Sequence, residues 1–136
     1  MIAIFAIMAL PLPAGQTSAR RRILLVEDDD GVRRSLHLML HGRGYDVRSY
    51  SAAVPLMAEA GYFDADCLIA DYRLIDTDGF SVLTTLRDAG WAGRSILITA
   101  WSDPQVRLEA RTCGYDMVLE KPVRPHDLIA AIEGPR

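Results

Sequence analysis

Four short apolar runs in the sequence lead into polar residues of different kinds. The runs are Ile23–Val26, Cys67–Ala70, Ser95–Ile98 and Met117–Leu119. The polar residues that follow them are Glu27–Asp30, Asp71, Thr99 and, after Glu120, Lys121. Short apolar runs bounded by helical patterns predict buried parallel strands, whose carboxyl ends share the edge of the sheet where ligands bind. We therefore expect acids, a threonine and a lysine to converge on one site.

The acidic run Glu27–Asp30 places consecutive carboxylates behind a buried strand, where they repel one another. A solvated loop in which Asp30 caps the next helix accounts for Asp29 and Asp30. It accounts less well for Glu27 and Asp28, which follow the strand directly. A hard divalent cation would relieve the repulsion, and Mg²⁺ typically takes one or two carboxylates together with water and phosphate oxygens. Glu27 and Asp28 are therefore candidate metal ligands.

Asp71 is a candidate nucleophile. Several residues separate it from the next predicted helix, so a helix-capping role fits it poorly. A parallel sheet would bring it beside Glu27 and Asp28, and an aspartate held by Mg²⁺ next to a phosphodonor can form an aspartyl-phosphate. The Lys121 ammonium would neutralise one phosphate oxygen, and the Thr99 hydroxyl would donate to another.

The elements that must hold these residues alternate between strand and helix five times after residue 22. The predicted strands cover residues 23–26, 45–50, 66–70, 95–98 and 116–119. The predicted helices cover residues 30–41, 51–61 with Ser51 as cap, 79–89, 103–114 with Asp103 as cap, and 125–132. This alternation predicts an α/β fold with a parallel sheet, right-handed crossovers and helices on both faces. Lys121–Pro122 is a candidate cis peptide bond that would aim the lysine inward.

The composition is that of one ordinary globular domain. The chain has 136 residues, a formal net charge of −3 and 50% hydrophobic residues. This charge offers no electrostatic case for nucleic acid. Cys67 and Cys113 have no metal-binding or redox spacing, so we expect two reduced packing thiols in a cytoplasmic protein.

Residues 1–22 stand apart from this pattern. Met1–Leu10 is almost wholly apolar, and the segment from Pro11 to Gly15 breaks any helix. This apolar run is too short to cross a bilayer, which takes about 20 residues, and a signal peptide would begin with basic residues. A disordered start, an arm that packs on a partner and an atypical export signal remain, and we favour the first. No membrane partner is expected.

Four motifs occur in order along the chain. They are Ile23–Asp29, Ala70–Leu74 followed by Asp78-Gly79, Ile98–Ala100 and Glu120–Pro122. Together they resemble the receiver domain of two-component response regulators. The resemblance covers about residues 21–133 and implies a doubly wound, flavodoxin-like (βα)5 fold with sheet order 2-1-3-4-5. It also implies that residues 23–133 form a phosphorylatable signalling domain and not an enzyme.

The resemblance assigns a role to each candidate site residue. Asp71 would accept phosphate from a sensor histidine kinase or a histidine phosphotransfer protein, while Thr99 and Lys121 would contact the phosphoryl group. The implied magnesium ligands are Asp28, Asp71, the backbone carbonyl of Arg73 and, in an assisting role, Glu27. The resemblance further implies phosphorylation by small phosphodonors and self-dephosphorylation.

One position departs from the pattern of the family. Receiver domains switch the face made by the fourth helix, fifth strand and fifth helix through a threonine and an aromatic residue on the fifth strand. The position three before Lys121 is Val118, which has no ring to turn inward. An alternative function is therefore a receiver-fold interaction module that works without phosphorylation. The intact set of site residues argues against this alternative.

Two other functions are suggested by the segment Asp76–Gly79. A calcium loop of the EF-hand type would begin at Leu74 and end at Thr85, and both positions should be acidic. A phosphohydrolase would carry its Asp-x-Asp pair directly after a buried strand, whereas this pair follows a polar loop. We reject the first and disfavour the second.

The output of the chain is left open by its sequence. No helix-turn-helix pattern or basic face is present, so this chain alone is not expected to bind DNA. It would serve as a stand-alone receiver, as a phosphate shuttle or as a piece of a longer regulator. The helix at 103–114 carries the mixed charges of Arg107, Glu109 and Arg111, a candidate homodimer surface. An ordinary solvated face is the simpler interpretation.

Overall fold

The computed structural model describes residues 20–100 and 103–135, and these form five strands, five α-helices and one 3₁₀ helix. The strands are β1 (Arg22–Val26), β2 (Asp46–Tyr50), β3 (Cys67–Asp71), β4 (Arg94–Thr99) and β5 (Met117–Glu120). The helices are α3 (Asp30–Gly42), α4 (Ala53–Met57), η1 (Ala60–Asp64), α5 (Gly79–Asp88), α6 (Pro104–Cys113) and α7 (Pro125–Glu133). The predictions for residues 1–19 lie outside the described residues.

The strands form one parallel sheet in the order β2-β1-β3-β4-β5. This confirms the predicted doubly wound α/β fold. The register aligns the carboxyl ends, since Val26 pairs with Ala70, Asp71 with Ile98, and Thr99 with Glu120. The chain leaves β1 toward β2 on one side, while β3 lies on the other, so the crevice of a doubly wound sheet opens between β1 and β3.

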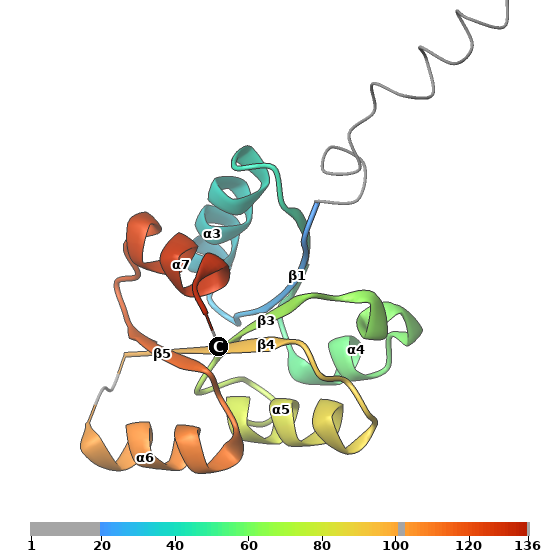
Figure 1. Ribbon diagram of the computed structural model, residues 1–136, viewed down its shortest axis with the longest axis vertical. Coiled ribbons are helices and arrows are strands. Elements are labelled where there is room, and N and C mark those ends of the chain that lie inside the picture. The colour runs from blue at the N-terminus through green and yellow to red at the C-terminus, as the bar shows by residue number, and fades with distance from the viewer. Residues whose placement is uncertain (1–19, 101–102, 136) are drawn as a thin grey trace, which may run out of the picture.

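Helices cover both faces of the sheet, with α3 and α7 on one side and α4, α5 and α6 on the other (Figure 1). Strand residues alternate between two hydrophobic cores because successive side chains point to opposite faces. The core beneath α4, α5 and α6 contains Leu24, Val26, Leu68, Ala70 and Leu97. The core beneath α3 and α7 contains Ile23, Leu25, Cys67, Ile69, Ile96 and Ile98. The central strands β1, β3 and β4 are therefore buried on both sides, and ligands would reach the carboxyl ends of the strands.

Three of the helices begin at an aspartate that accepts a hydrogen bond from a backbone N–H of the first turn. Asp29 accepts from Val32, Asp78 from Ser81 and Asp103 from Val106, each at 2.8 Å. The cap of α3 is therefore Asp29, and the prediction that Asp30 caps this helix was wrong. Asp30 is exposed and pairs instead with Arg33 at 2.6 Å, one turn along the same helix.

The second helix differs most from its prediction. A helix over 51–61 was expected, but α4 covers only Ala53–Met57 and a separate 3₁₀ turn, η1, follows it. A Ser51 cap would accept from the N–H groups of residues 53 and 54. Both groups donate instead to the carboxylate of Asp76, at 3.0 and 2.8 Å. The cap therefore comes from a distant segment, which local sequence patterns do not reveal.

Two further observations concern the predictions from composition. Cys67 is buried, Cys113 is partly exposed, and neither forms a disulfide. Burial raises the pKa of the Cys67 thiol to about 12, as expected for an inert packing residue. Within residues 20–100 and 103–135, no helix combines the length and the apolar character needed to cross a membrane.

Candidate functional site

The candidate site residues meet at the carboxyl edge of the sheet. Glu27 follows β1, Asp71 is the last residue of β3, and Thr99 is the last residue of β4. Lys121 follows β5, and its backbone N–H donates to the Thr99 carbonyl at 2.8 Å. The four strand ends that the sequence singled out are therefore adjacent.

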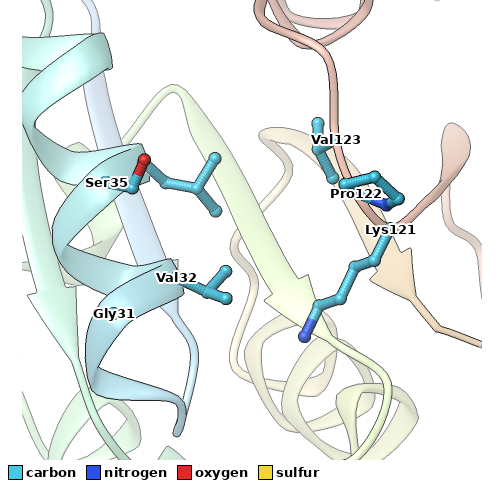
Figure 2. A pocket seen from close by; sticks show the side chains of 7 residues that line it. Gly31, Val32, Ser35, Lys121, Pro122 and Val123 are labelled. Atoms are coloured by element: carbon cyan, nitrogen blue, oxygen red, sulfur yellow. The ribbon is translucent and has the colours of Figure 1, made fainter.

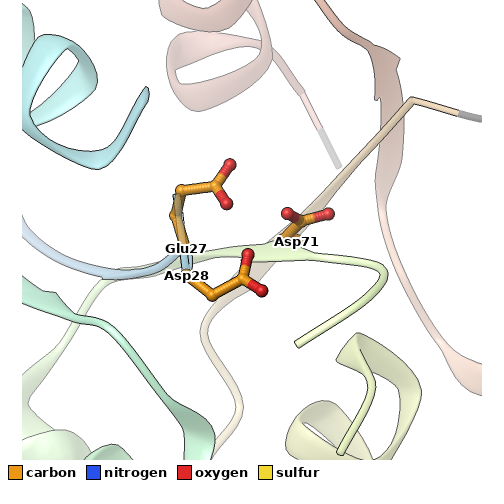
Figure 3. Close-up of side chains that lie close together, drawn as sticks. All are labelled: Glu27, Asp28 and Asp71. Carbon is orange, nitrogen blue, oxygen red and sulfur yellow. The ribbon is translucent and has the colours of Figure 1, made fainter. Parts of the chain in front are cut away.

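Three carboxylates cluster between β1 and β3. One oxygen each from Glu27, Asp28 and Asp71 lies within 4.8 Å of the others. Figure 3 shows the three side chains gathered where the two strands end. Glu27 and Asp71 are buried, whereas Asp28 is exposed. The cluster therefore has a buried floor and an open side.

Lys121 supplies the cation of this site. Its Nζ lies 2.6 Å from Glu27 Oε1 and 2.7 Å from Asp71 Oδ2. The peptide bond between Lys121 and Pro122 is cis, as the sequence suggested. In Figure 2 the lysine side chain extends from the end of β5 with its ammonium directed away from Pro122. One ammonium thus contacts two carboxylates that come from different strands.

Burial and charge shift the proton affinities of the two ion-paired residues. Burial, with a hydrogen bond to Asp71, raises the pKa of Glu27 to about 7, although Lys121 and the Asp29 N–H at 3.1 Å act in the opposite direction. Burial lowers the pKa of Lys121, but its bonds to Asp71 and Glu27 outweigh this and raise it. Lys121 is therefore charged at neutral pH, while the pKa of Glu27 lies close to neutral pH.

The donor set fits a hard divalent cation. Three carboxylates face one ammonium, so the cluster has surplus negative charge when all three acids are ionised. Mg²⁺ prefers oxygen ligands and keeps several waters, and the exposed side at Asp28 leaves room for them. These residues are suited to Mg²⁺ on the chemistry of the oxygens they present.

Arg73 and Thr99 lie at the same edge of the sheet as the cluster. Arg73 lies in the loop after β3, where its N–H is 3.4 Å from Asp71 Oδ1. Thr99 is 1% exposed at the end of β4. All six residues singled out in the sequence therefore lie at the same edge of the sheet, although their individual roles stay predictions.

Sequence reasoning missed two residues that support the site. The guanidinium of Arg33 donates to the Glu27 backbone carbonyl at 2.8 Å, and the backbone of Asp29 donates to the Glu27 carboxylate. Both contacts position the buried acid. Arg33 carried a weak signal, since it stands one helical turn after the acidic run.

An apolar pocket of about 460 Å³ adjoins Lys121. It lies between the first turns of α3 and the segment after β5 (Figure 2). Its lining residues are Gly31, Val32, Ser35, Leu36, Lys121, Pro122 and Val123. The site is therefore flanked by an apolar recess on the side of α3.

Comparison with known proteins shows the family. The model of the response regulator receiver domain matches residues 23–133, and the chain belongs to this family. It is 35% identical over 115 residues to the transcriptional regulatory protein GltR of Pseudomonas aeruginosa, covering 83% of this chain and 48% of that protein. It is 33% identical over 109 residues to FixJ of Rhizobium meliloti, with 80% and 53% covered. The chain spans about half the length of these curated relatives.

Solved structures share the fold. A CheY-like response regulator receiver domain protein from Methanospirillum hungatei JF-1 matches with a TM-score of 0.75 and 25% identity, covering 83% of this chain and 90% of that one. A response regulator from Burkholderia pseudomallei, solved with a phosphorylated aspartic acid, a calcium ion and citrate, matches with a TM-score of 0.76 and 24% identity. That match covers 83% of this chain and 66% of the other. The protein is thus a receiver domain of the two-component response regulators.

Proposed function

We propose that this receiver domain accepts a phosphoryl group on Asp71 in a Mg²⁺-dependent reaction. The observation that carries the proposal is the position of Lys121 Nζ, 2.6 Å from Glu27 and 2.7 Å from Asp71, beside the three-acid cluster. In an in-line phosphoryl transfer to the buried aspartate, the lysine would neutralise phosphoryl oxygens, and the acids would hold the Mg²⁺ that does the same.

In the proposed step, a carboxylate oxygen of Asp71 attacks the phosphorus of a phosphohistidine. A phosphorus–oxygen bond forms, the phosphorus–nitrogen bond breaks, and the imidazole leaves with the bonding electron pair. Mg²⁺, when bound, would neutralise the phosphoryl oxygens. Its ligands would be Asp28, Asp71 and the Arg73 carbonyl, with Glu27 assisting.

Lys121 and Thr99 would receive the phosphoryl group. In the unphosphorylated protein the lysine ammonium contacts Asp71 Oδ2, so it can pass to a phosphoryl oxygen with a small movement. The Thr99 hydroxyl would donate to a second oxygen. The partner implied by this chemistry is a histidine kinase or a histidine phosphotransfer protein, and the proposed location is the cytoplasm.

Labelling with acetyl phosphate and Mg²⁺, followed by intact-mass spectrometry, tests this proposal. The wild-type chain should take up one phosphoryl group, and Asp71→Asn should take up none. Asp30→Asn is the matched control, because Asp30 belongs to the same acidic run as Glu27 and Asp28 but is exposed and paired with Arg33. It should label like the wild type. Labelling that persists in Asp71→Asn would move the nucleophile elsewhere.

An interaction module independent of phosphorylation is the second candidate. One observation favours it: Val118 on β5, half-buried beside the core under α6, cannot provide the aromatic part of the family's switch. A wild-type chain that does not label would support this alternative. The face of α6, β5 and α7 is the proposed switching surface and a candidate homodimer surface in either case. DNA binding is not proposed for this chain alone.

A further inference from the structure

The loop between β3 and α5, residues 72–78, folds into a tight turn. The Leu74 N–H donates to the Thr77 carbonyl at 3.0 Å, and Arg73 forms an isolated bridge with Asp78. At its base, the Gly79 N–H donates to the Tyr72 carbonyl at 2.8 Å. These hydrogen bonds connect Arg73 to the rest of the turn.

Asp76 ties the tip of this turn to another helix. Its Oδ1 accepts from the Ala53 N–H at 3.0 Å and its Oδ2 from the Val54 N–H at 2.8 Å. Both amides lie in the first turn of α4, where the preceding residue, Ala52, offers no side-chain acceptor. Asp76 is thus an acceptor for the start of α4, contributed from a segment more than 20 residues away in sequence.

Helix α4, which donates these hydrogen bonds to Asp76, is packed into the hydrophobic core. Ala53 and Leu56 of α4 are both fully buried in the core under α4, α5 and α6. At the tip of the turn, by contrast, Ile75 is 79% exposed. Beyond Leu74, which packs against the core, the tip is therefore attached through the hydrogen bonds of Asp76.

We propose that Asp76 is a positioning residue for the metal site, because it holds the turn that presents the Arg73 carbonyl. The inference rests on the proposed function, in which that carbonyl is a ligand. It also concerns Asp71 directly, since the Arg73 N–H lies 3.4 Å from Asp71 Oδ1. Releasing the turn would loosen both groups on one side of the acidic cluster and leave Glu27 and Asp28 in place.

The expected size of the effect follows from how metal sites are supported. Removing a group that orients a ligand typically costs 10- to 100-fold in metal affinity. Asp76 is three residues from Arg73 and acts on its carbonyl only indirectly, so we expect an effect at the lower end of this 10- to 100-fold range. Asp76→Ala should raise the Kd for Mg²⁺ about tenfold. Asp76→Asn keeps one carbonyl oxygen as an acceptor and should fall in between.

The test is a Mg²⁺ titration without any phosphodonor, followed by the amide chemical shifts of Asp28 and Arg73. Amide hydrogen exchange at Ala53 and Val54 is measured on the same samples. Asp76→Ala should show the weaker Mg²⁺ binding together with faster exchange at these two amides. A Kd equal to that of the wild type would overturn the inference.

Asp116→Ala is the matched control. Asp116 also accepts a backbone hydrogen bond, from the Ser95 N–H at 2.9 Å, but at the amino edge of the sheet. This variant should keep the Mg²⁺ affinity of the wild type even where its stability falls. Equal weakening in Asp116→Ala and Asp76→Ala would assign the effect to general loosening of the domain and reject the positioning role. A wild-type chain that binds no Mg²⁺ would reject the proposed function itself, and this inference with it.

Discussion

Lys121 lies between two acids that would otherwise repel each other. In the absence of a metal, its ammonium is the only cation in contact with both Glu27 and Asp71 among the ion pairs of the described residues. Glu27 is fully buried, and a buried carboxylate is costly unless it is paired. In the metal-free site, one ammonium therefore balances two neighbouring carboxylates only in part, and a divalent cation would reduce their remaining repulsion.

The pH dependence of stability should report this partial balance of charge. Burial raises the pKa of Glu27 from 4.5 to about 7 in the folded protein. Between these values the folded state binds more protons than the unfolded state, so Glu27 makes stability fall as the pH rises. A glutamine at position 27 cannot ionise, so Glu27→Gln should remove the contribution of this residue to the pH dependence of stability.

Urea unfolding of metal-free protein at pH 5 and pH 8 measures the effect. The stability of Glu27→Gln relative to the wild type should increase between the two values, in the range of a few kcal/mol. A constant difference between the two proteins would show that Glu27 is ionised throughout and that its burial is offset by Lys121.

At the residue scale, the sequence indicated which side chains meet but not how they pair. Glu27, Asp28, Asp71, Thr99 and Lys121 were predictable because each stands at or near the carboxyl end of a short apolar run, and a parallel sheet aligns these ends. The double ion pair of Lys121 was not, since it depends on side-chain geometry across three strands. The cap at Asp29 was misplaced by one residue because two neighbouring aspartates suit that position equally well.

At the scale of elements, Gly79 marks where α5 meets the site. A Cβ at this position would lie 2.7 Å from the Asp71 carbonyl oxygen and 2.7 Å from Leu97 Cδ1. The glycine lets the start of the helix pack directly against the end of β3. Its own carbonyl accepts from the Tyr115 hydroxyl at 2.6 Å, which joins α5 to the segment between α6 and β5.

Tyr115→Phe should therefore destabilise the domain. The change removes one hydrogen bond to the Gly79 carbonyl, and a typical intramolecular hydrogen bond contributes about 0.5–1.5 kcal/mol. The ring remains, so its packing near Phe80 is kept. Tyr62→Phe is the control, because the Tyr62 hydroxyl has no hydrogen bond within the part of the chain that the structure describes, and it should be nearly neutral. Equilibrium unfolding in urea compares the two, and equal stabilities would contradict the assigned hydrogen bond.

Most elements were predictable within a residue or two. The strands have short apolar runs, and α5, α6 and α7 have the Asp or Pro signals of helix starts. The region of α4 was not predictable, because its acceptor is Asp76, far away in sequence. Local sequence patterns predict hydrogen bonds between residues close in sequence, whereas the bonds from Ala53 and Val54 to Asp76 are tertiary contacts.

At the scale of the whole molecule, Mg²⁺ should stabilise the folded domain, since a ligand that binds only the folded state adds RT ln(1 + [L]/Kd). At a concentration ten times Kd this is about 1.4 kcal/mol. Thermal unfolding with and without MgCl₂, at matched ionic strength, measures it. Asp28→Asn should lose most of the shift, and Asp30→Asn, outside the cluster, should keep it. A shift of equal size in both variants would indicate a general salt effect.

Residues 23–133 match the family model of the receiver domain. They do not indicate which process the domain controls. Because the chain spans about half the length of its curated relatives, what a phosphoryl group on Asp71 would control is a question about partners. The chemistry at the sheet edge can be tested without them.

Mapping the phosphorylated residue is the decisive test of phosphoryl transfer to Asp71. The chain is treated with acetyl phosphate and Mg²⁺, reduced with sodium borohydride and mapped by peptide mass spectrometry. Reduction converts an aspartyl-phosphate to homoserine, and we expect this conversion at position 71 and nowhere else. Conversion at Asp28 or Glu27, or none at any acid under conditions that label other receiver domains, would contradict this expectation.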